Sequence, residues 1–322
     1  MINYKNNNVM NILITGATGL IGAAILNKLI GKGHEIIGLS RSIKDDTDFI
    51  KWIQHDLYND EILSLNLPKD IDVVYHLAGQ TSTYTAKNDP IADLNINVTG
   101  FLNLLEYFKS VKECPFVVLA GTATEVGLVD DIPINEAMRD NPITFYDLSK
   151  LTAENYLKQY VREGWVRGCT LRLANVFGRN QKGQNQDRGI IDKIFYRALA
   201  KNNITIFGDG ECKRDYIFID DVASAFIRST EFTETTNGLT FYIGSGNGVS
   251  LKSAFQKVIS LAAKVTGTQV KCEHVAPPKE LSDIEFRNVV IDSSLFTEAT
   301  GWKPEYDFDS GLIAAYQSYF PK

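Results

Sequence analysis

From Asn11 onward, short apolar stretches alternate with stretches in which apolar residues recur at helical spacing. The apolar stretches predict strands, which we expect at residues 11–15, 34–39, 73–77, 116–120 and 169–173. The intervening patterns predict helices, most clearly at residues 21–30, 98–108 and 149–161. Because strands that alternate with helices form a parallel sheet covered on both faces, the pattern predicts a doubly wound α/β fold.

After Asn175 this alternation weakens. A segment rich in Gly, Asn and Gln (180–189) precedes an expected helix at 190–200 and a Gly-Asp-Gly turn at 208–210. Strand-like stretches return at 216–219 and 240–243. We therefore expect one larger domain and one smaller lobe. The larger domain comprises residues 11–175 with returning segments near 215–244, and the lobe comprises 176–214 and 245–322.

The composition excludes several classes of function. The 33 lysines and arginines are outnumbered by 39 acidic residues, so the formal charge is -6 and there is no general basic surface for nucleic acid or an anionic membrane. The first ten residues are polar and resemble no signal peptide. The four cysteines stand far apart, without metal-ligand spacing. We expect a cytoplasmic protein without a bound metal.

Residues Thr15 to Gly22 read Thr-Gly-Ala-Thr-Gly-Leu-Ile-Gly and lie between an expected strand and an expected helix. Gly16 and Gly19 allow a tight turn and a close approach to a pyrophosphate, while Gly22 allows helix and strand to pack closely. The helix N-terminus adds unpaired N–H groups and a positive dipole end. The motif favours a dinucleotide site over a glycine-rich turn that binds nothing.

Tyr146 and Lys150 are four residues apart at the start of an expected helix, so both side chains share one face. An unperturbed phenol has a pKa near 10, and lowering it to about 7 requires about 4 kcal/mol of differential stabilisation. A neighbouring ammonium can supply this, so Tyr146 is a candidate acid/base. The alternative is an exposed pair on a solvated helix.

Taken in order, the chain's motifs resemble those of the extended short-chain dehydrogenase/reductases, in the branch that modifies nucleotide-activated sugars. The resemblance covers nearly the whole chain, from the glycine motif to Gly301-Trp302-Lys303-Pro304. The other matching segments are His76–Gly79, Asn95–Gly100, Tyr146–Lys150, Leu171–Gly178 and Gly208–Tyr216. The resemblance implies an NAD(P) cofactor, a nucleotide diphosphate sugar as substrate, and a homodimer formed through helices near 96–108 and 149–161.

The same resemblance implies a third catalytic residue with a hydroxyl group. Counting back from Gly127 places it at Thr122, with Thr124 as the competing assignment. Thr122 would hydrogen-bond the reacting oxygen. Related 4,6-dehydratases carry an Asp-Glu pair directly after this position, where the present chain has Ala123 and Thr124. Dehydration is therefore not expected.

Ser40 and Arg41 follow the second expected strand. An acid at the position of Ser40 would bind the ribose hydroxyls of NAD, whereas an arginine nearby accommodates the 2′-phosphate of NADP. We therefore expect NADP, with NAD as the alternative. Asp56 corresponds to the acid that holds the adenine amino group. The expected cofactor contacts are Gly16, Thr18, Gly19, Leu20, Ile21, Gly22, Ser40, Arg41, Asp56, Leu57, Leu77, Ala78, Gly79, Asn97, Tyr146 and Lys150.

The resemblance also implies substrate contacts outside the glycine motif. Asn175 corresponds to a ligand of the phosphates or the sugar, and Arg214 to the arginine that binds the pyrophosphate bidentately. Arg188 and Arg287 are weaker candidates, for the base and the phosphates, and a surface ion pair is the alternative for each of these arginines. Thr122 and Thr124 complete the expected substrate site.

These residues predict hydride transfer at C4 of a nucleotide-bound hexose. The sequence favours reduction of a 4-keto-(6-deoxy)hexose nucleotide, chiefly because of Ser40 and Arg41. One alternative is a 4-epimerase that retains NAD. A second alternative, from another class, is a non-catalytic NADP-binding redox sensor, although such sensors usually lack the Tyr-x-x-x-Lys pair.

Overall fold

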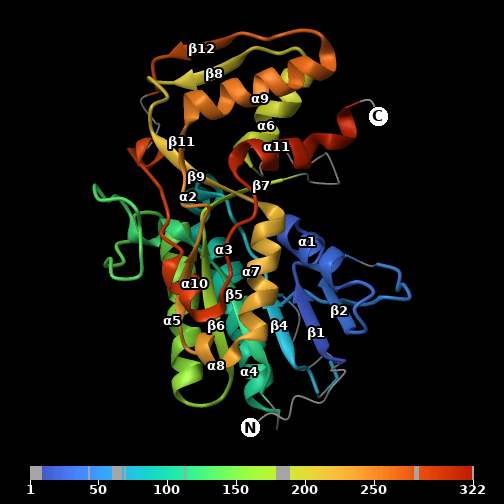
Figure 1. Ribbon diagram of the computed structural model, residues 1–322. Helices are drawn as coiled ribbons and strands as arrows, with labels where there is room; N and C mark the ends of the chain where they lie inside the picture. Colours follow the sequence, from blue (N-terminus) through green and yellow to red (C-terminus); the bar gives the residue numbers. More distant parts are fainter. Residues whose placement is uncertain are drawn as a thin grey trace.

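The computed structural model describes residues 9–42, 44–59, 67–68, 70–111, 114–178, 189–278 and 283–320. Its centre is a seven-stranded sheet in which each pair of neighbouring strands is parallel (Figure 1). In spatial order the strands are β10 (Thr240–Ile243), β6 (Arg167–Leu173), β5 (Phe116–Thr122), β4 (Val73–His76), β1 (Asn11–Thr15), β2 (Glu35–Ser40) and β3 (Ile50–Gln54). The predicted doubly wound fold is confirmed, and β3 is a strand that the sequence pattern did not reveal.

The strand order reverses between β1 and β4, and in such sheets ligands bind at the carboxyl ends of the strands beside this point. The chain leaves β1 into the glycine motif and α1 (Leu20–Leu29), and it leaves β4 into Leu77–Gly79. Two of the segments predicted to bind the cofactor therefore meet at the reversal. The segment predicted to carry the catalytic threonine lies at the end of β5, one strand further along the sheet.

Apolar side chains form a separate core on each face of this sheet, because successive residues of a strand point to opposite faces. In β1, Ile12 and Ile14 belong to one core and Leu13 to the other. The first core includes residues of α1 and α7 (Ile219–Glu231), and the second includes residues of α4 (Gly100–Lys109) and α5 (Phe145–Arg162). The second core packs α5, and with it Tyr146 and Lys150, against β5.

Short helical segments surround the edge that carries the site. They are α2 (Thr83–Asn88), α3 (Pro90–Leu94), the π-helical segment η2 (Asn95–Thr99) and the 3₁₀ segment η3 (Ala123–Val126). The sequence predicted one regular helix near 96–108, whereas the structure has η2 followed by α4. π-Helical turns are rare and occur frequently at functional sites.

Two smaller sheets lie beyond the carboxyl edge (Figure 1). One contains β7 (Asn175–Phe177), β9 (Lys213–Phe218) and β11 (Gly248–Ser250), and the other contains β8 (Ile204–Phe207) and β12 (Cys272–Val275). The stretch predicted at 216–219 thus forms part of β9 and pairs outside the large sheet. The remaining segments are α6 (Ile190–Leu199), α8 (Thr233–Thr236), α9 (Leu251–Thr266), η4 (Asp283–Phe286), α10 (Ser294–Thr300), α11 (Phe308–Tyr316) and η5 (Gln317–Tyr319).

Candidate active site

The glycine motif forms a turn that leaves no room for side chains at two positions. Gly16 has φ +66°, and a Cβ there would lie 2.7 Å from the backbone N of Ala78. A Cβ on Gly22 would lie 2.5 Å from the carbonyl oxygen of Gly16. Gly19 caps the N-terminus of α1 without a side-chain hydrogen bond, so N–H groups of the first turn remain for a ligand. The turn therefore fits the pyrophosphate of a dinucleotide.

The loop after β4 is tied to the glycine motif by Thr15, which the sequence analysis did not select. The Thr15 hydroxyl accepts hydrogen bonds from the backbone N of Leu77 (3.2 Å) and of Ala78 (3.1 Å), and it lies 3.0 Å from Nδ1 of His76. Burial, followed by the charge of Lys150, lowers the pKa of His76 to about 3. His76 is thus a neutral, buried residue, and the lysine approaches the end of β4.

Asn97 holds this loop in place from the π-helical segment. Its Oδ1 accepts from the backbone N of Gln80 at 3.0 Å, and its Nδ2 donates to Gln80 O at 3.1 Å and to Asp93 Oδ1 at 3.0 Å. A Cβ on Gly79 would lie 2.8 Å from the same Oδ1. Asp93 is 1% exposed and was not predicted, although its position four residues before Asn97 places both on one helical face.

The expected specificity residues meet at the ends of β2 and β3. Ser40 is buried with its hydroxyl 3.3 Å from that of Ser42, whereas Arg41 is exposed. Burial alone would raise the pKa of Asp56, but hydrogen bonds from Asn59 and Tyr58 and the charge of Arg41 lower it. Leu57 is buried. No acidic side chain takes the place of Ser40, and Arg41 is available at the surface.

Thr122, Tyr146 and Lys150 converge beside this edge. Thr122 ends β5, and its hydroxyl is a hydrogen-bond partner of the Tyr146 phenol, close enough to influence the pKa of the phenol. Lys150 is 8% exposed and makes no hydrogen bond or ion pair with the residues that the structure describes. A buried ammonium without a protein partner needs a ligand, and the ribose hydroxyls of a dinucleotide fit this need.

The pKa of Tyr146 is raised within the protein chain, contrary to the acidic phenol expected from the sequence. Burial is the main cause, and the charges of Asp147 and Glu125 add to it, while the Thr122 hydrogen bond opposes them. The pKa of Lys150 is lowered by burial, against the opposing charges of Glu125 and Asp93. Both shifts arise mainly from burial, which the spacing of residues in the sequence does not show.

A buried cluster of charges supports Thr122, the candidate catalytic threonine. Glu125 Oε1 accepts from the backbone N of Thr122 at 3.1 Å, closing a capping box at the start of η3. Its other oxygen lies 3.1 Å from Arg172, which also binds Glu154 and Asp140. Burial and the charge of Glu154 raise the pKa of Glu125 to about 8. Three acids share one guanidinium here, and the protonated form is favoured at Glu125.

Thr124, the competing hydroxyl, donates to a different group. Its Oγ1 lies 2.9 Å from that of Thr122 and donates to Asp147 Oδ1. Asp147 is fully buried beside Tyr146 and was not predicted, although it follows the tyrosine directly. The Thr124 hydroxyl therefore lies between Asp147, to which it donates, and the Thr122 hydroxyl. The structure thus gives the two threonines separate places in one hydroxyl chain.

Two of the predicted arginines lie together near this site, Arg214 in β9 and Arg287 directly after η4. Arg214 donates to the carbonyl oxygens of Glu285, at 2.7 Å, and of Arg287. Arg287 interacts electrostatically with Asp147, Arg214 and Tyr146. Asn175 is exposed at the start of β7, and no hydrogen bond brings it to the catalytic residues in the described structure. Arg188 lies outside the described residues.

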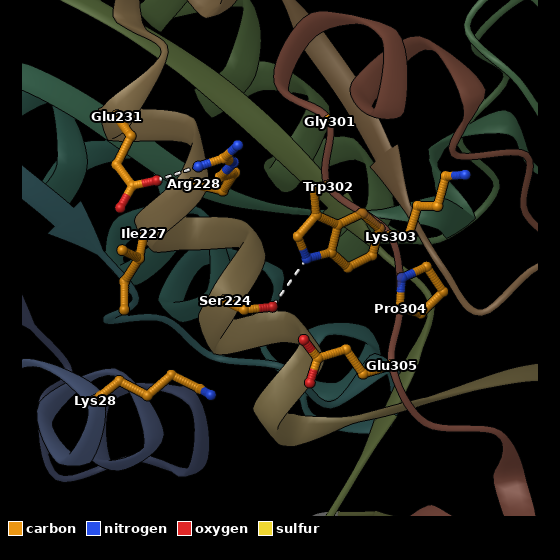
Figure 2. A pocket seen from close by; sticks show the side chains of 10 residues that line it. All are labelled: Lys28, Ser224, Ile227, Arg228, Glu231, Gly301, Trp302, Lys303, Pro304 and Glu305. Carbon is orange, nitrogen blue, oxygen red and sulfur yellow. Dashed lines mark hydrogen bonds and ion pairs between the residues drawn. The ribbon is translucent and has the colours of Figure 1, made fainter.

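A cavity of about 530 Å³ lies away from these residues, between α7 and Gly301–Glu305 (Figure 2). In it, Trp302 Nε1 donates to Ser224 at 2.9 Å and Arg228 pairs with Glu231. A second cavity, of about 740 Å³, borders Thr18–Leu20 from the side of α7 and η5. Neither is lined by Thr122, Tyr146 or Lys150.

Among the described residues, no group of three or more His, Cys, Asp or Glu side chains is arranged to hold a metal ion. No helix in the described part of the chain is both long and apolar enough to span a membrane.

Known proteins resemble this chain over most of its length. It is 28% identical to a UDP-glucose 4-epimerase of Mycolicibacterium smegmatis, over 96% of this chain and 98% of the relative. A GDP-6-deoxy-D-mannose reductase of Pseudomonas aeruginosa is 30% identical over 81% of this chain and 84% of its own. The crystal structure of a UDP-glucose 4-epimerase from Thermotoga maritima, with UDP-glucose, superposes with a TM-score of 0.83 at 28% identity, covering 96% and 98% of the two chains.

The model of one family matches residues 12–244, which include the glycine turn, the candidate catalytic residues and Arg214. Its relatives include both epimerases and reductases of nucleotide sugars, in agreement with the branch expected from the motifs. This chain belongs to the NAD dependent epimerase/dehydratase family and is an NAD(P)-dependent nucleotide-sugar enzyme of the extended short-chain dehydrogenase/reductase type.

Proposed function

We propose that this protein interconverts the C4 epimers of a nucleotide diphosphate hexose. The observation that carries the proposal is the convergence of Thr122, Tyr146 and buried Lys150 beside the glycine turn. The sequence favoured reduction of a 4-keto sugar, which stays an untested prediction. The relatives named as UDP-glucose 4-epimerases give more support to the alternative.

In this mechanism the glycine turn would hold the pyrophosphate, with Leu77–Gly79 and Asn97 beside it and Lys150 on the ribose. A dinucleotide held there would supply a reversible hydride acceptor for C4 of the sugar, and return of the hydride to the opposite face would give the other epimer. Tyr146 takes the proton of the C4 hydroxyl and gives it back to the opposite epimer. Thr122 holds the same oxygen, and Arg214 binds the diphosphate.

Reduction is the second candidate, and the cofactor distinguishes it. Buried Ser40 without an acid and exposed Arg41 support NADP, which a reductase consumes and exchanges. Epimerisation consumes no cofactor and suits a retained NAD. We propose that segments 11–175 and 215–244 bind the dinucleotide, and that 176–214 and 245–322 bind the nucleotide sugar, with Asn175, Arg188 and Arg287 among its contacts.

The test is to release and identify the dinucleotide of the purified protein, and then to supply UDP-glucose and follow UDP-galactose by NMR. Interconversion without net cofactor consumption supports the epimerase. Consumption of added NADPH with a 4-keto-sugar nucleotide supports the reductase. Tyr146→Phe should abolish turnover and retain the cofactor. If the variant instead behaves in every respect like the wild type, the protein is a redox sensor.

We also propose a homodimer through α4 and α5. Exposed apolar residues on α5 support it, since Leu148 is 51% exposed and Tyr156 is 43% exposed. Exposed apolar residues that gather on one side mark interaction surfaces. Analytical ultracentrifugation should give twice the 35.9 kDa mass of the chain, and a monomer for Leu148→Glu.

A further inference from the structure

Asp147 and Arg287 each keep one buried polar atom without a hydrogen-bond partner. Oδ1 of Asp147 accepts from Thr124, but its Oδ2 has no partner. Nη1 of Arg287 is also buried without a partner. Leaving a charged group partly unsatisfied inside a protein is costly, so both atoms indicate a missing polar group.

The Asp147 carboxylate and the Arg287 guanidinium carry opposite charges and interact electrostatically without direct contact. Arg287 lowers the pKa of Asp147 against the larger effect of burial, and Asp147 in turn favours the charged form of Arg287. They form no ion pair in the described structure, so a direct contact does not satisfy either orphan atom. A bridging group must complete the arrangement.

This pair lies beside the reacting position. Asp147 follows Tyr146 directly on α5, and Arg287 interacts with the charge of the Tyr146 phenol. Arg214, the proposed phosphate ligand, donates to the backbone carbonyl of Arg287 and thereby fixes the segment that carries it. A group between Asp147 and Arg287 therefore lies close to the carbon on which Tyr146 acts.

We infer that Asp147 and Arg287 form a subsite for a hexose hydroxyl close to C4, either O3 on the neighbouring carbon C3 or O6 on the exocyclic carbon C6. The inference rests on the proposed function. The bridging group must donate to Asp147 Oδ2 and accept from Arg287 Nη1, and a hydroxyl does both. A phosphate or a carboxylate has acceptors only and is repelled by Asp147. A deoxy carbon offers neither a donor for Asp147 nor an acceptor for Arg287. Arg287 therefore binds the sugar rather than the phosphates.

The experiment measures dissociation constants of UDP-glucose, UDP-3-deoxyglucose and UDP-6-deoxyglucose. The protein is Tyr146→Phe with its dinucleotide bound, so that no sugar is converted. A hydrogen bond to a charged group contributes a factor of about 10 to 100 in affinity. One of the two deoxy analogues should bind weaker by this factor. Asp147→Ala on the same background should weaken UDP-glucose similarly, with no further loss for that analogue.

The inference is overturned if the two effects are additive, that is, if each deoxy analogue binds weaker than UDP-glucose by the same factor in the presence and in the absence of Asp147→Ala. The bridging group is then a water molecule. Asp147→Asn preserves shape and keeps an acceptor, so it should weaken UDP-glucose less than Asp147→Ala. The exposed Asp309→Asn serves as the control and should leave all affinities unchanged. Thermal unfolding confirms that each variant is folded.

A separate assay of the wild type distinguishes this inference from the proposed function. If the effects of Asp147→Ala and of the deoxy substitution on affinity are non-additive but UDP-glucose is not epimerised, the proposed subsite is supported and the proposed reaction is wrong. If neither UDP-glucose nor its analogues bind, both proposals fail. UDP-glucuronate adds a further check. If the hydroxyl is O6, UDP-glucuronate should bind the wild-type protein weakly, and the difference between its affinity and that of UDP-glucose should become smaller in Asp147→Asn.

Discussion

Gly22→Ala should separate the α1 helix from the glycine turn. Gly22 lies within α1 with a helical neighbour on each side, so the added methyl group meets no unfavourable φ. It does meet backbone atoms, because the new Cβ would lie 2.5 Å from Gly16 O and 2.7 Å from Ala17 Cα. An ordinary contact begins at 3.4 Å, so the helix must shift by about 0.9 Å, the difference between 3.4 and 2.5 Å.

The magnitude follows from two opposing effects. Replacing a helical glycine by alanine stabilises a protein by about 0.5–1 kcal/mol. Overpacking against atoms that cannot rotate away costs about 1–3 kcal/mol or more. Gly22→Ala should therefore be destabilised by about 1–2 kcal/mol. Dinucleotide affinity should fall at least about tenfold, because the shifted helix N-terminus no longer faces the pyrophosphate.

Gly100→Ala is the matched control. Gly100 also lies in a helix, but its added Cβ would meet Leu57 Cβ at 3.4 Å, an ordinary contact. This variant should gain about 0.5–1 kcal/mol. Urea unfolding of both variants and the wild type, with fluorescence titration of the dinucleotide for Gly22→Ala, measures the difference. Equal stability of the two variants would refute the reasoning that backbone proximity excludes a side chain at Gly22.

Three further variants test the buried charges. Glu125 has a pKa of about 8 in the folded chain against an ordinary 4.5, so its favourable contribution is complete below pH 4.5 and is lost as the pH rises towards 8. Urea unfolding between pH 5 and pH 8 should show that the free energy of unfolding of the wild type declines by up to about 1.4 kcal/mol per pH unit. An equal decline in Glu125→Gln would contradict the raised pKa of Glu125. Arg172→Met leaves buried acids without their guanidinium and should cost about 3–5 kcal/mol of unfolding free energy; a loss below about 1 kcal/mol would argue against it. Asp93→Ala removes one of two acceptors from each of the Asn97 and Gln80 amide groups and should weaken dinucleotide binding about tenfold, measured by titration. Unchanged affinity would show that Asp93 does not support the loop.

The motifs of this chain indicated its fold and the members of its site because their spacing encodes local geometry. Gly16 and Gly22 predicted a crowded turn, and the structure shows backbone atoms within 3 Å of any added Cβ. The alternation of apolar residues predicted the sheet, since period two and helical spacing are properties of neighbouring residues. The strand β3 escaped this pattern because its burial is uneven along the strand.

Tertiary structure decided what lies around Tyr146. The direction of its pKa shift depends on burial and on Glu125 and Asp147, and desolvation is a property of the packed chain rather than of residue spacing. The approach of Arg287 to Asp147 joins positions that are 140 residues apart, as 287 minus 147 shows. Sequence spacing sets which side chains share a strand or helix, whereas the opposing charges and orphaned atoms at this site arise only when distant segments pack together.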